Sequence, residues 1–337
     1  MIAVPHVEGV LSADEVIASG RHLAALQTPS GMIPWFPGGH CDPWNHVESA
    51  MALDVAGFQV EAERAYEWLA AVQRPDGSWH NYYLPDGHRD DTVEEWKLDT
   101  NVCAYIATGV WHHWRCTGDR GFVDNLWPAV DWVLGLRRDD GLVLWAIEPH
   151  DRPWDYALLT GSASIQHALR CGAAVGLAVG RPRPDWVEAA DVMCALIAHE
   201  PLAFQPKSRW AMDWYYPVLT GAISDEAAKA RLADGWQTFS MEGLGIRCVF
   251  DEPWVTASET AEAALAYAAI GDIDTAIDLL AWTRNHRLGN GAYLTGLVYP
   301  ERIVFPDAEH TSYTAAAVIL AADAISQASP ASDLFRH

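Results

Sequence analysis

The sequence predicts an all-α fold, an (α/α)6 barrel or toroid in which about twelve helices alternate between an inner and an outer ring. Three observations predict it: helical periodicity along the chain, connections that alternate between short and long, and short motifs that recur. Half of the 337 residues are hydrophobic, which is enough for the large core of a closed barrel. We therefore expect a single domain that spans residues 1–337.

Apolar residues recur at helical spacing in segments that are separated by Gly, Pro and aromatic residues. The predicted helices span residues 13–27, 43–59, 61–73, 99–115, 119–137, 161–179, 184–199, 213–223, 225–238, 255–270, 272–287 and 310–325. No segment shows the alternation of polar and apolar residues that is typical of an exposed strand, so no sheet is expected.

The lengths of the connections predict how these helices are arranged. The short connections are 57–59, 116–119, 180–184, 224–225 and 271–272. The long connections are 28–42, 74–98, 138–160, 201–212, 239–254 and 288–309. Because every long connection leads into the second helix of a hairpin, all long loops are expected at one end of the barrel, where they can surround a cavity.

Turn motifs repeat after the helices that we assign to the outer ring. Residues 27–35 read QTPSGMIPW, residues 73–79 read QRPDGSW, and residues 138–145, RDDGLVLW, are a weaker copy. The helices assigned to the inner ring carry small residues that allow close helix packing, namely Ala163, Ala173, Ala174, Ala263, Ala264, Ala315 and Ala316.

Composition and charge restrict the ligands that the cavity can take. The formal net charge is −23, from 45 acidic and 22 basic residues, which disfavours nucleic acids, anionic membranes and uronic acid polymers. The chain contains 17 Trp and 11 Tyr but only 8 Phe, and Trp and Tyr suit half-hydrated surfaces that stack on ligands. A neutral ligand fits best.

The sequence predicts no cofactor and no metal site. HExxH and DxDxDG motifs are absent, and the six cysteines are scattered without a CxxC pair. Free thiols are typical of a reducing cytosol, and residues 1–10 lack the basic and apolar regions of a signal peptide. We therefore expect a cytoplasmic protein; the sequence leaves its oligomeric state open.

The segment 68–79, WLAAVQRPDGSW, resembles the QW repeat of squalene and terpene cyclases and of prenyltransferase-like toroids. This resemblance covers the repeat motif and does not extend to the catalytic motifs of those enzymes. The DxDD motif of class II cyclases is absent, and residues 90–94, DDTVE, give a single DDxxE-like run on a loop. This reading remains an alternative.

The arrangement of the whole chain is more similar to the six-hairpin glycosidases, which also have (α/α)6 barrels and place catalytic carboxylates where inner helices begin. Among them, the short, Trp-rich chain resembles the actinobacterial methylmannose polysaccharide hydrolases, which are endo-acting α-mannosidases. The resemblance implies a catalytic domain that cleaves a neutral α-linked polysaccharide with two carboxylates. Because relatives with this fold largely invert the anomeric centre, it also implies an inverting mechanism.

Glycoside hydrolysis requires one protonated carboxyl group, which donates to the leaving oxygen, and one ionised carboxylate. Glu259 and Glu262 lie one turn apart on an Ala-rich helix, and the deeper Glu262 is our candidate for the acid. Asp42 and Asp99 rank together as its partner, ahead of Glu48. Both aspartates also have the sequence context of helix N-caps, which would explain them without catalysis.

Residues that combine acids, amides, histidine and aromatic rings near the long loops are candidates for binding the substrate. They are Trp44, His46, Glu48, Trp79, Trp96, Asn101, Trp154, Asp155, Asp213, Trp214, Tyr215, Trp254 and His310.

Two further alternatives remain at this point. A sugar epimerase on the same barrel would use histidines for proton transfer at a sugar carbon, and the candidates are His40, His46, His80, His88 and His310. A non-catalytic carbohydrate-binding toroid would keep the aromatic residues without a carboxylate pair at hydrolytic spacing.

Overall fold

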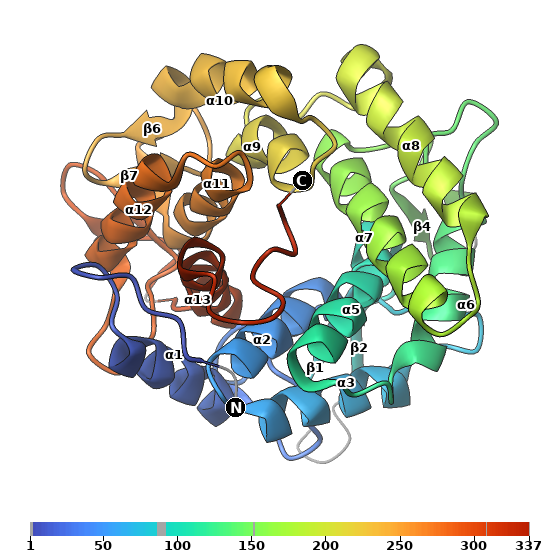
Figure 1. Cartoon of the computed structure of the whole chain (residues 1–337), viewed down its shortest axis with the longest axis horizontal. Coiled ribbons are helices and arrows are strands. Elements are labelled where there is room, and N and C mark those ends of the chain that lie inside the picture. Colours follow the sequence, from blue (N-terminus) through green and yellow to red (C-terminus); the bar gives the residue numbers. More distant parts are fainter. Residues whose placement is uncertain (1–2, 86–91, 151, 308, 337) are drawn as a thin grey trace.

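The computed structural model describes residues 3–85, 92–150, 152–307 and 309–336, which form a ring of helices in two layers (Figure 1). The inner helices, in ring order, are α2 (Pro43–Val55), α4 (Thr100–Ala104) with α5 (Ile106–Thr117), α7 (Leu159–Ala178), α9 (Ala211–Leu219), α11 (Ala257–Ala269) and α13 (Ser312–Ser326). Each packs against the next, and α13 packs against α2, so the ring is closed. The predicted (α/α)6 toroid is confirmed.

The outer helices pack on the outside of this ring and alternate with the inner ones along the chain. They are α1 (Ala13–Leu26), α3 (Gln59–Val72), α6 (Val123–Leu134), α8 (Pro184–His199), α10 (Asp225–Phe239) and α12 (Ile273–Trp282), with the 3-10 helices η1 (Pro201–Ala203) and η2 (Thr283–His286) after α8 and α12. Almost every residue of α13 is buried, whereas α10 buries only Ala228, Leu232 and Phe239. The inner helices are therefore enclosed on all sides, and their small residues allow the neighbouring helices to pack closely. Within the described residues, no helix is both long and apolar enough to cross a membrane.

Two details of the predicted secondary structure are wrong. The helix expected at 99–115 is divided at Tyr105 into α4 and α5. The expectation of no sheet is also wrong, because short antiparallel strands line the long loops. They are β1 (Tyr82–Leu84), β2 (Thr92–Glu95), β3 (Leu98–Asp99), β4 (Ala146–Glu148), β5 (Arg152–Pro153), β6 (Ser240–Met241), β7 (Gly245–Arg247), β8 (Trp254–Thr256), β9 (Gly296–Val298) and β10 (Ile303–Val304). Strands of this length are too short for alternation to be visible in the sequence.

The strands join neighbouring loops to one another. β1 pairs with β2, while β3, β4 and β5 connect the loop before α4 to the loop before α7. A five-stranded sheet in the order β10-β9-β8-β7-β6 connects the loops before α11 and α13. The long-loop end of the barrel is therefore a framework of paired backbone.

The repeated turn motif attaches one hairpin to the next outer helix. The side-chain amide of Gln73 donates hydrogen bonds to the carbonyls of Gly77 (3.0 Å) and Asn125 (2.9 Å), the latter on α6. Gly77 has φ +94°, and a Cβ at this position would lie 2.4 Å from the backbone of Pro128 on the same helix. Gln27 makes the equivalent bonds to Gly31 and to a carbonyl of α3. The similarity of this turn to the QW repeat thus reflects a structural role, which is to attach each turn to the next outer helix.

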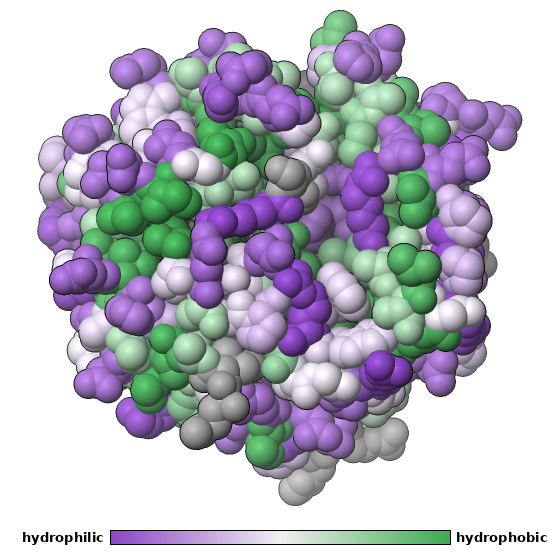
Figure 2. Space-filling model, viewed as in Figure 1, coloured by the Kyte–Doolittle hydropathy of each residue, from purple (hydrophilic) through white to green (hydrophobic). Residues whose placement is uncertain are grey.

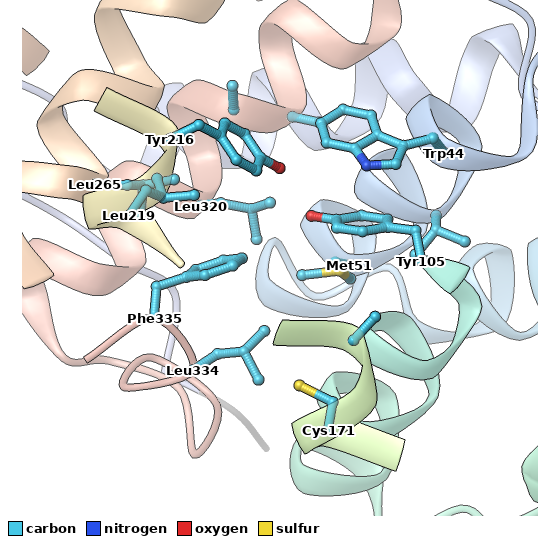
Figure 3. Packing of buried hydrophobic residues seen from close by; sticks show 14 of the residues in the cluster. Trp44, Met51, Tyr105, Cys171, Tyr216, Leu219, Leu265, Leu320, Leu334 and Phe335 are labelled. Atoms are coloured by element: carbon cyan, nitrogen blue, oxygen red, sulfur yellow. The ribbon is translucent and has the colours of Figure 1, made fainter. Parts of the chain in front are cut away.

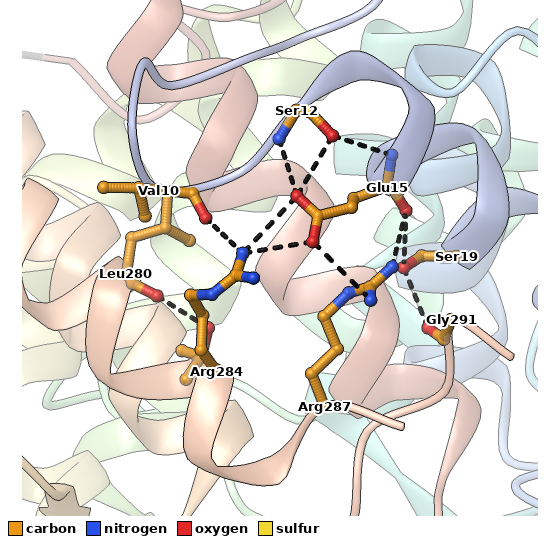
Figure 4. Close-up of polar contacts among 9 residues, drawn as sticks. Val10, Ser12, Glu15, Ser19, Leu280, Arg284, Arg287 and Gly291 are labelled. Atoms are coloured by element: carbon orange, nitrogen blue, oxygen red, sulfur yellow. Dashed lines mark hydrogen bonds and ion pairs between the residues drawn. The ribbon is translucent and has the colours of Figure 1, made fainter. Parts of the chain in front are cut away.

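The ring closes between its first and last outer helices (Figure 4). Glu15 on α1 accepts hydrogen bonds from Ser12 in a capping box and pairs with Arg284 (3.1 Å) and Arg287 (3.6 Å), which lie in and just after η2. Ser19 donates a hydrogen bond of 2.8 Å to the carbonyl of Gly291, the glycine that packs against α1.

The C-terminal residues fill the centre of the ring on the face opposite the long loops. Phe335 stacks on His167 of α7 (ring centroids 4.9 Å apart), and the ring of His167 hydrogen-bonds the carbonyl of Leu334. Figure 3 shows Phe335 below Leu320 and level with Met51, with Leu334 lower still. On this face, hydrophilic side chains lie across the middle of the molecule, with hydrophobic patches to either side (Figure 2). The barrel therefore has a solid floor.

Candidate active site

A cavity of about 390 Å³ opens where the inner helices begin, among the long loops. We call it the pocket. Its lining combines carboxylates, amides and aromatic rings: Trp35, Asp42, Trp44, Asn45, Asn81, Tyr82, Lys97, Asp99, Asn101, Val102, Trp145, Thr160, Met212, Tyr216, Ser258, Glu259, Glu262 and Tyr313. Of the carboxylates proposed from the sequence as catalytic, Asp42, Asp99, Glu259 and Glu262 line this pocket and Glu48 does not.

Asp42 caps α2 and is fixed on both of its oxygens. Oδ1 accepts the backbone N–H of Asn45 (3.0 Å), while Oδ2 accepts the indole N–H of Trp35 (2.7 Å) and the side-chain amide of Asn45 (2.6 Å). Burial raises the pKa of Asp42, and these hydrogen bonds oppose the rise. Asp42 is thus both the helix cap that its sequence context suggested and a wall of the pocket.

Asp99 caps α4 in a different way, because only Oδ1 is held by the helix. It accepts the backbone N–H groups of Asn101 (2.9 Å) and Val102 (3.3 Å). Burial raises the pKa of Asp99 to about 6, against the opposing effect of the Lys97 ammonium group. An aspartate with this pKa is ionised at neutral pH and close to the proton affinity that suits a general base.

Glu262 lies on α11, one turn further along the helix than Glu259, and its side chain is buried. The phenol of Tyr215, on the neighbouring helix α9, donates a hydrogen bond to its Oε2. Burial raises the pKa of Glu262 well above its ordinary value, and the charges of Glu48 and Glu259 raise it further. A carboxyl group with a raised pKa retains its proton more readily, as a general acid requires.

Glu259, one turn nearer the mouth, is surrounded by donors. Its carboxylate accepts hydrogen bonds from the hydroxyls of Thr256 and Ser258 and from the thiol of Cys248 (3.2 Å). Glu259 is thus fixed in orientation beside Glu262.

Glu48 lies behind the pocket wall. It is buried on α2 and accepts a hydrogen bond of 3.2 Å from the hydroxyl of Tyr105, whose ring stacks on Trp44 (centroids 4.6 Å apart, Figure 3). Burial raises the pKa of Glu48 to about 8. The sequence suggested that Glu48 is the partner carboxylate or a sugar ligand, but Glu48 does not line the pocket. Its effect on the site is electrostatic, because its charge raises the pKa of Glu262.

Aromatic rings and unpaired polar atoms complete the pocket. Trp44 and Tyr216 form its deep side, and the ammonium group of Lys97 lies 4.6 Å from the ring centre of Trp145. Within the described chain, Nε1 of Trp44 and Oδ1 of Asn101 are buried without a hydrogen-bond partner. A donor and an acceptor left open beside aromatic faces suit a sugar, which offers both hydroxyls and apolar C–H faces.

Several predicted binding residues instead belong to the core. His46 accepts the N–H of Ile33 (3.1 Å) and hydrogen-bonds the carbonyl of Ala65 (2.9 Å). The indoles of Trp79 and Trp214 are buried and donate to the carbonyls of Leu69 and Arg231. Tyr215 contacts Glu262 but does not line the pocket.

The remaining predicted binding residues lie around the pocket. Asp213 lies behind Thr160, which donates a hydrogen bond of 2.6 Å to it, and Asp213 lines a different cavity. Trp96 and Asp155 are exposed, Trp154 hydrogen-bonds Glu148, His310 packs edge-on against His22, and Trp254 lines a separate groove.

Sequence reasoning missed several aromatic residues of the pocket. Trp35 and Trp145 lie on loops, Tyr82 on β1, and Tyr216 and Tyr313 on the inner helices α9 and α13. Trp35 and Trp145 end two copies of the repeated turn motif, so the repeat itself could have indicated them. Among the residues that the structure describes, no group of three or more His, Cys, Asp and Glu side chains is arranged to hold a metal ion.

Comparison with known proteins assigns this chain to a family, although no family model matches it. The chain is 47% identical to the MMP endo-(1,4)-3-O-methyl-α-D-mannosidase of Mycolicibacterium hassiacum over 338 aligned positions, which cover 99% of this chain and 92% of that protein. The chain belongs to this glycosidase family. The resemblance to the actinobacterial hydrolases is confirmed.

Solved structures share the fold at low sequence identity. A wild-type glycosidase superposes with a TM-score of 0.72 at 15% identity, covering 92% of this chain and 97% of the other. A D-mannose isomerase has a TM-score of 0.69 at 13% identity, with the same coverage. At this identity the likeness concerns the barrel alone.

Family membership decides among the alternatives left open by the sequence. A member of a glycosidase family is an enzyme that cleaves glycosidic bonds, so the terpenoid, epimerase and non-catalytic readings are set aside. His88 of the epimerase reading and Asp90 and Asp91 of the diphosphate reading lie outside the described residues.

Proposed function

We propose that this chain is an endo-acting α-mannosidase that cleaves a neutral polysaccharide of 3-O-methylmannose by an inverting mechanism with two carboxylates. The relative of known activity acts on such a glycan by its name, and it aligns with nearly the whole chain. The observation that carries the mechanism is the difference between two buried carboxyl groups of the pocket. The pKa of Glu262 is raised well above its ordinary value, whereas the pKa of Asp99, which is hydrogen-bonded to two helix N–H groups and to Trp145, is raised only to about 6.

Glu262 is the general acid. Its carboxyl group protonates the glycosidic oxygen as the bond to the anomeric carbon breaks, so the leaving sugar departs as a neutral alcohol. The low-polarity surroundings that keep Glu262 protonated also make proton donation favourable when negative charge develops on the leaving oxygen.

Asp99 is the general base. Going round the ring from α11, α9 and α7 lie on one side and α13 and α2 on the other, so α4 lies opposite α11 (Figure 1). Asp99 and Glu262 therefore approach the sugar from opposite walls. Asp99 removes a proton from a water molecule that attacks the far face of the anomeric carbon, which inverts its configuration.

The other pocket groups bind and orient the sugar. Trp44, Trp145 and Tyr216 offer aromatic surfaces for its C–H faces, and Asn101 and Asp42 offer polar atoms for its hydroxyls. An O-methyl group adds apolar surface, which the aromatic lining accommodates without unpaired polar atoms.

The mechanism is tested by comparing Glu262→Gln, Asp99→Asn and Asp42→Asn on a methylmannose oligosaccharide, with the anomer of the first product followed by NMR. We expect inversion by the wild type and losses in kcat of roughly 10²–10⁴-fold for the first two variants. Asp213→Asn is the matched control, a buried aspartate in the first turn of α9 outside the pocket. A larger loss in Asp42→Asn than in Asp99→Asn would make Asp42 the base, and retention of configuration would refute the inverting mechanism.

We further propose that the enzyme acts in the cytoplasm. None of its six cysteines forms a disulfide, as is usual in a reducing compartment. Fractionation of the source cells with an antibody against the protein tests this assignment, and recovery in the extracellular fraction would contradict it.

A further inference from the structure

A second aromatic surface lies on the long-loop face, outside the pocket. It is a groove of about 400 Å³ that we call the aromatic groove, lined by Arg209, Trp210, Val249, Glu252, Trp254, Val298 and Phe305. The side chains of Trp210 and Phe305 are 41% and 49% exposed. Large rings that remain this exposed contribute little to the core, so their position calls for another explanation.

The sheet β6–β10 shows why these rings are not needed for packing. Val255, Leu297 and Tyr299 point to one face of the sheet and form a buried cluster. Trp254 and Val298 pair directly across β8 and β9 and point to the opposite face, which remains partly exposed. One face of the sheet is thus packed and the other forms the groove wall.

The exposed rings are held in place. The indole N–H of Trp254 donates a hydrogen bond of 3.1 Å to the carbonyl of Phe305, and the two rings meet edge to face at 5.1 Å. Gly296 leaves room for this indole, since a Cβ there would lie 2.1 Å from Nε1 of Trp254. Arg209 lies over the ring of Trp210 at 5.5 Å. A surface with fixed rings loses little conformational entropy on binding.

The aromatic groove and the pocket share a wall at Cys248. The thiol of Cys248 donates to Glu259 in the pocket, its N–H donates to the carbonyl of Trp254, and its carbonyl accepts the N–H of Ala211 beside Trp210. Trp254 precedes the pocket residue Ser258 by four residues, so their Cα atoms lie within about 14 Å of each other even if that segment were fully extended.

We propose that the aromatic groove is a second carbohydrate-binding site, which takes methylated sugar units of the same polysaccharide beyond those bound in the pocket. The inference rests on the proposed function. The charge of Arg209 is neutralised by Asp251 at 2.9 Å, and Glu252 adds a carboxylate to the lining, so the groove suits a neutral ligand better than an anionic one. Fixed indole and phenyl rings stack on the C–H faces of a sugar and contact its O-methyl group. An endo-acting enzyme must hold its chain on both sides of the cleaved bond, and the groove supplies such a hold.

The test compares a long methylmannose polysaccharide with the shortest oligosaccharide that the enzyme cleaves. In Trp210→Ala and Phe305→Ala we expect KM for the long substrate to rise on the order of tenfold, which corresponds to about 1.4 kcal/mol of binding, while kcat and the cleavage of the short substrate remain unchanged. Phe250→Ala is the matched control, because Phe250 is 45% exposed on the adjoining loop but does not line the groove. Trp254 is unsuited to this test because its side chain also orients Phe305.

Binding by the inactive Glu262→Gln variant separates this proposal from the proposed function. Calorimetry with the long polysaccharide should show weaker binding when Trp210→Ala is added, and the preference for methylated over unmethylated mannan chains should decrease. An unchanged KM for the long substrate, or an equal loss on both substrates, would overturn the proposal. So would a wild-type dimer that Trp210→Ala dissociates in sedimentation, since a second copy of the chain would then occupy the groove. If the wild type binds the polysaccharide through Trp210 but cleaves nothing, the proposed function fails and the binding site stands.

Discussion

The phenol of Tyr215 donates its hydrogen bond to Oε2 of Glu262, so the buried carboxyl group of Glu262 is oriented by the neighbouring inner helix. The contact joins α9 to α11 at the point where proton transfer is expected. It also favours the ionised form of Glu262 and thereby limits the rise in the pKa that burial causes.

Replacement of Tyr215 by Phe should therefore raise the pKa of Glu262 further and leave its carboxyl group less well oriented. We expect kcat to fall roughly tenfold and the alkaline limb of the pH–rate profile to move to higher pH. Tyr293→Phe, a buried tyrosine remote from the pocket, is the control. An alkaline limb that stays in place would mean that Tyr215 supports only the fold.

The acidic limb of kcat/KM should reflect Asp99. A general base must be ionised, so activity should decline as the pH falls through the pKa of Asp99, about 6. Lys97 lowers this pKa, and Lys97→Met should therefore move the acidic limb upward by about one pH unit. The measurement is kcat/KM between pH 4 and 8, and a limb that does not respond to the loss of Lys97 would point to Asp42.

Glu48 should affect the opposite limb. Above about pH 8 Glu48 ionises, and its charge then makes ionisation of Glu262 more difficult. In Glu48→Gln this charge never appears while Tyr105 can still donate its hydrogen bond to the amide oxygen, so the alkaline limb should move to lower pH. The acidic limb should not change. A uniform loss of kcat at every pH would instead indicate that Glu48 acts through the structure alone.

The loss of stability on replacing a turn glycine should depend on how closely other atoms approach that glycine. Gly77→Ala combines backbone strain with a clash against Pro128, and we expect a loss of about 4 kcal/mol in the free energy of unfolding. Gly57 has φ +90° but open space around it, so Gly57→Ala should cost only about 1–2 kcal/mol. Urea unfolding of both variants gives the comparison, and equal losses would show that the contact with α6 contributes nothing.

The sequence predicted the barrel well because its information is local and repeated. Helical periodicity marks the elements, and Asp42, Asp99 and Glu262 were identifiable as acids near the starts of inner helices. The binding residues were harder to predict, because the type of a residue does not reveal the direction in which it points. Trp79 and Trp214 have the composition of sugar-binding residues but lie in the core. Tyr82 reaches the pocket from β1 within a long loop, and Tyr313 from the first turn of α13, and neither position follows from helical periodicity.

The pairing of Glu15 with Arg284 and Arg287 has a consequence for the whole molecule. In an open array of helical hairpins the two terminal units each expose an apolar side and need a polar cap. Here the first hairpin and the last protect each other, so every unit has two neighbours and none serves as a cap. No hairpin can separate from the ring without breaking its interfaces with both neighbouring hairpins. Closure of the ring consequently holds the walls of the pocket at fixed distances from one another through each catalytic cycle.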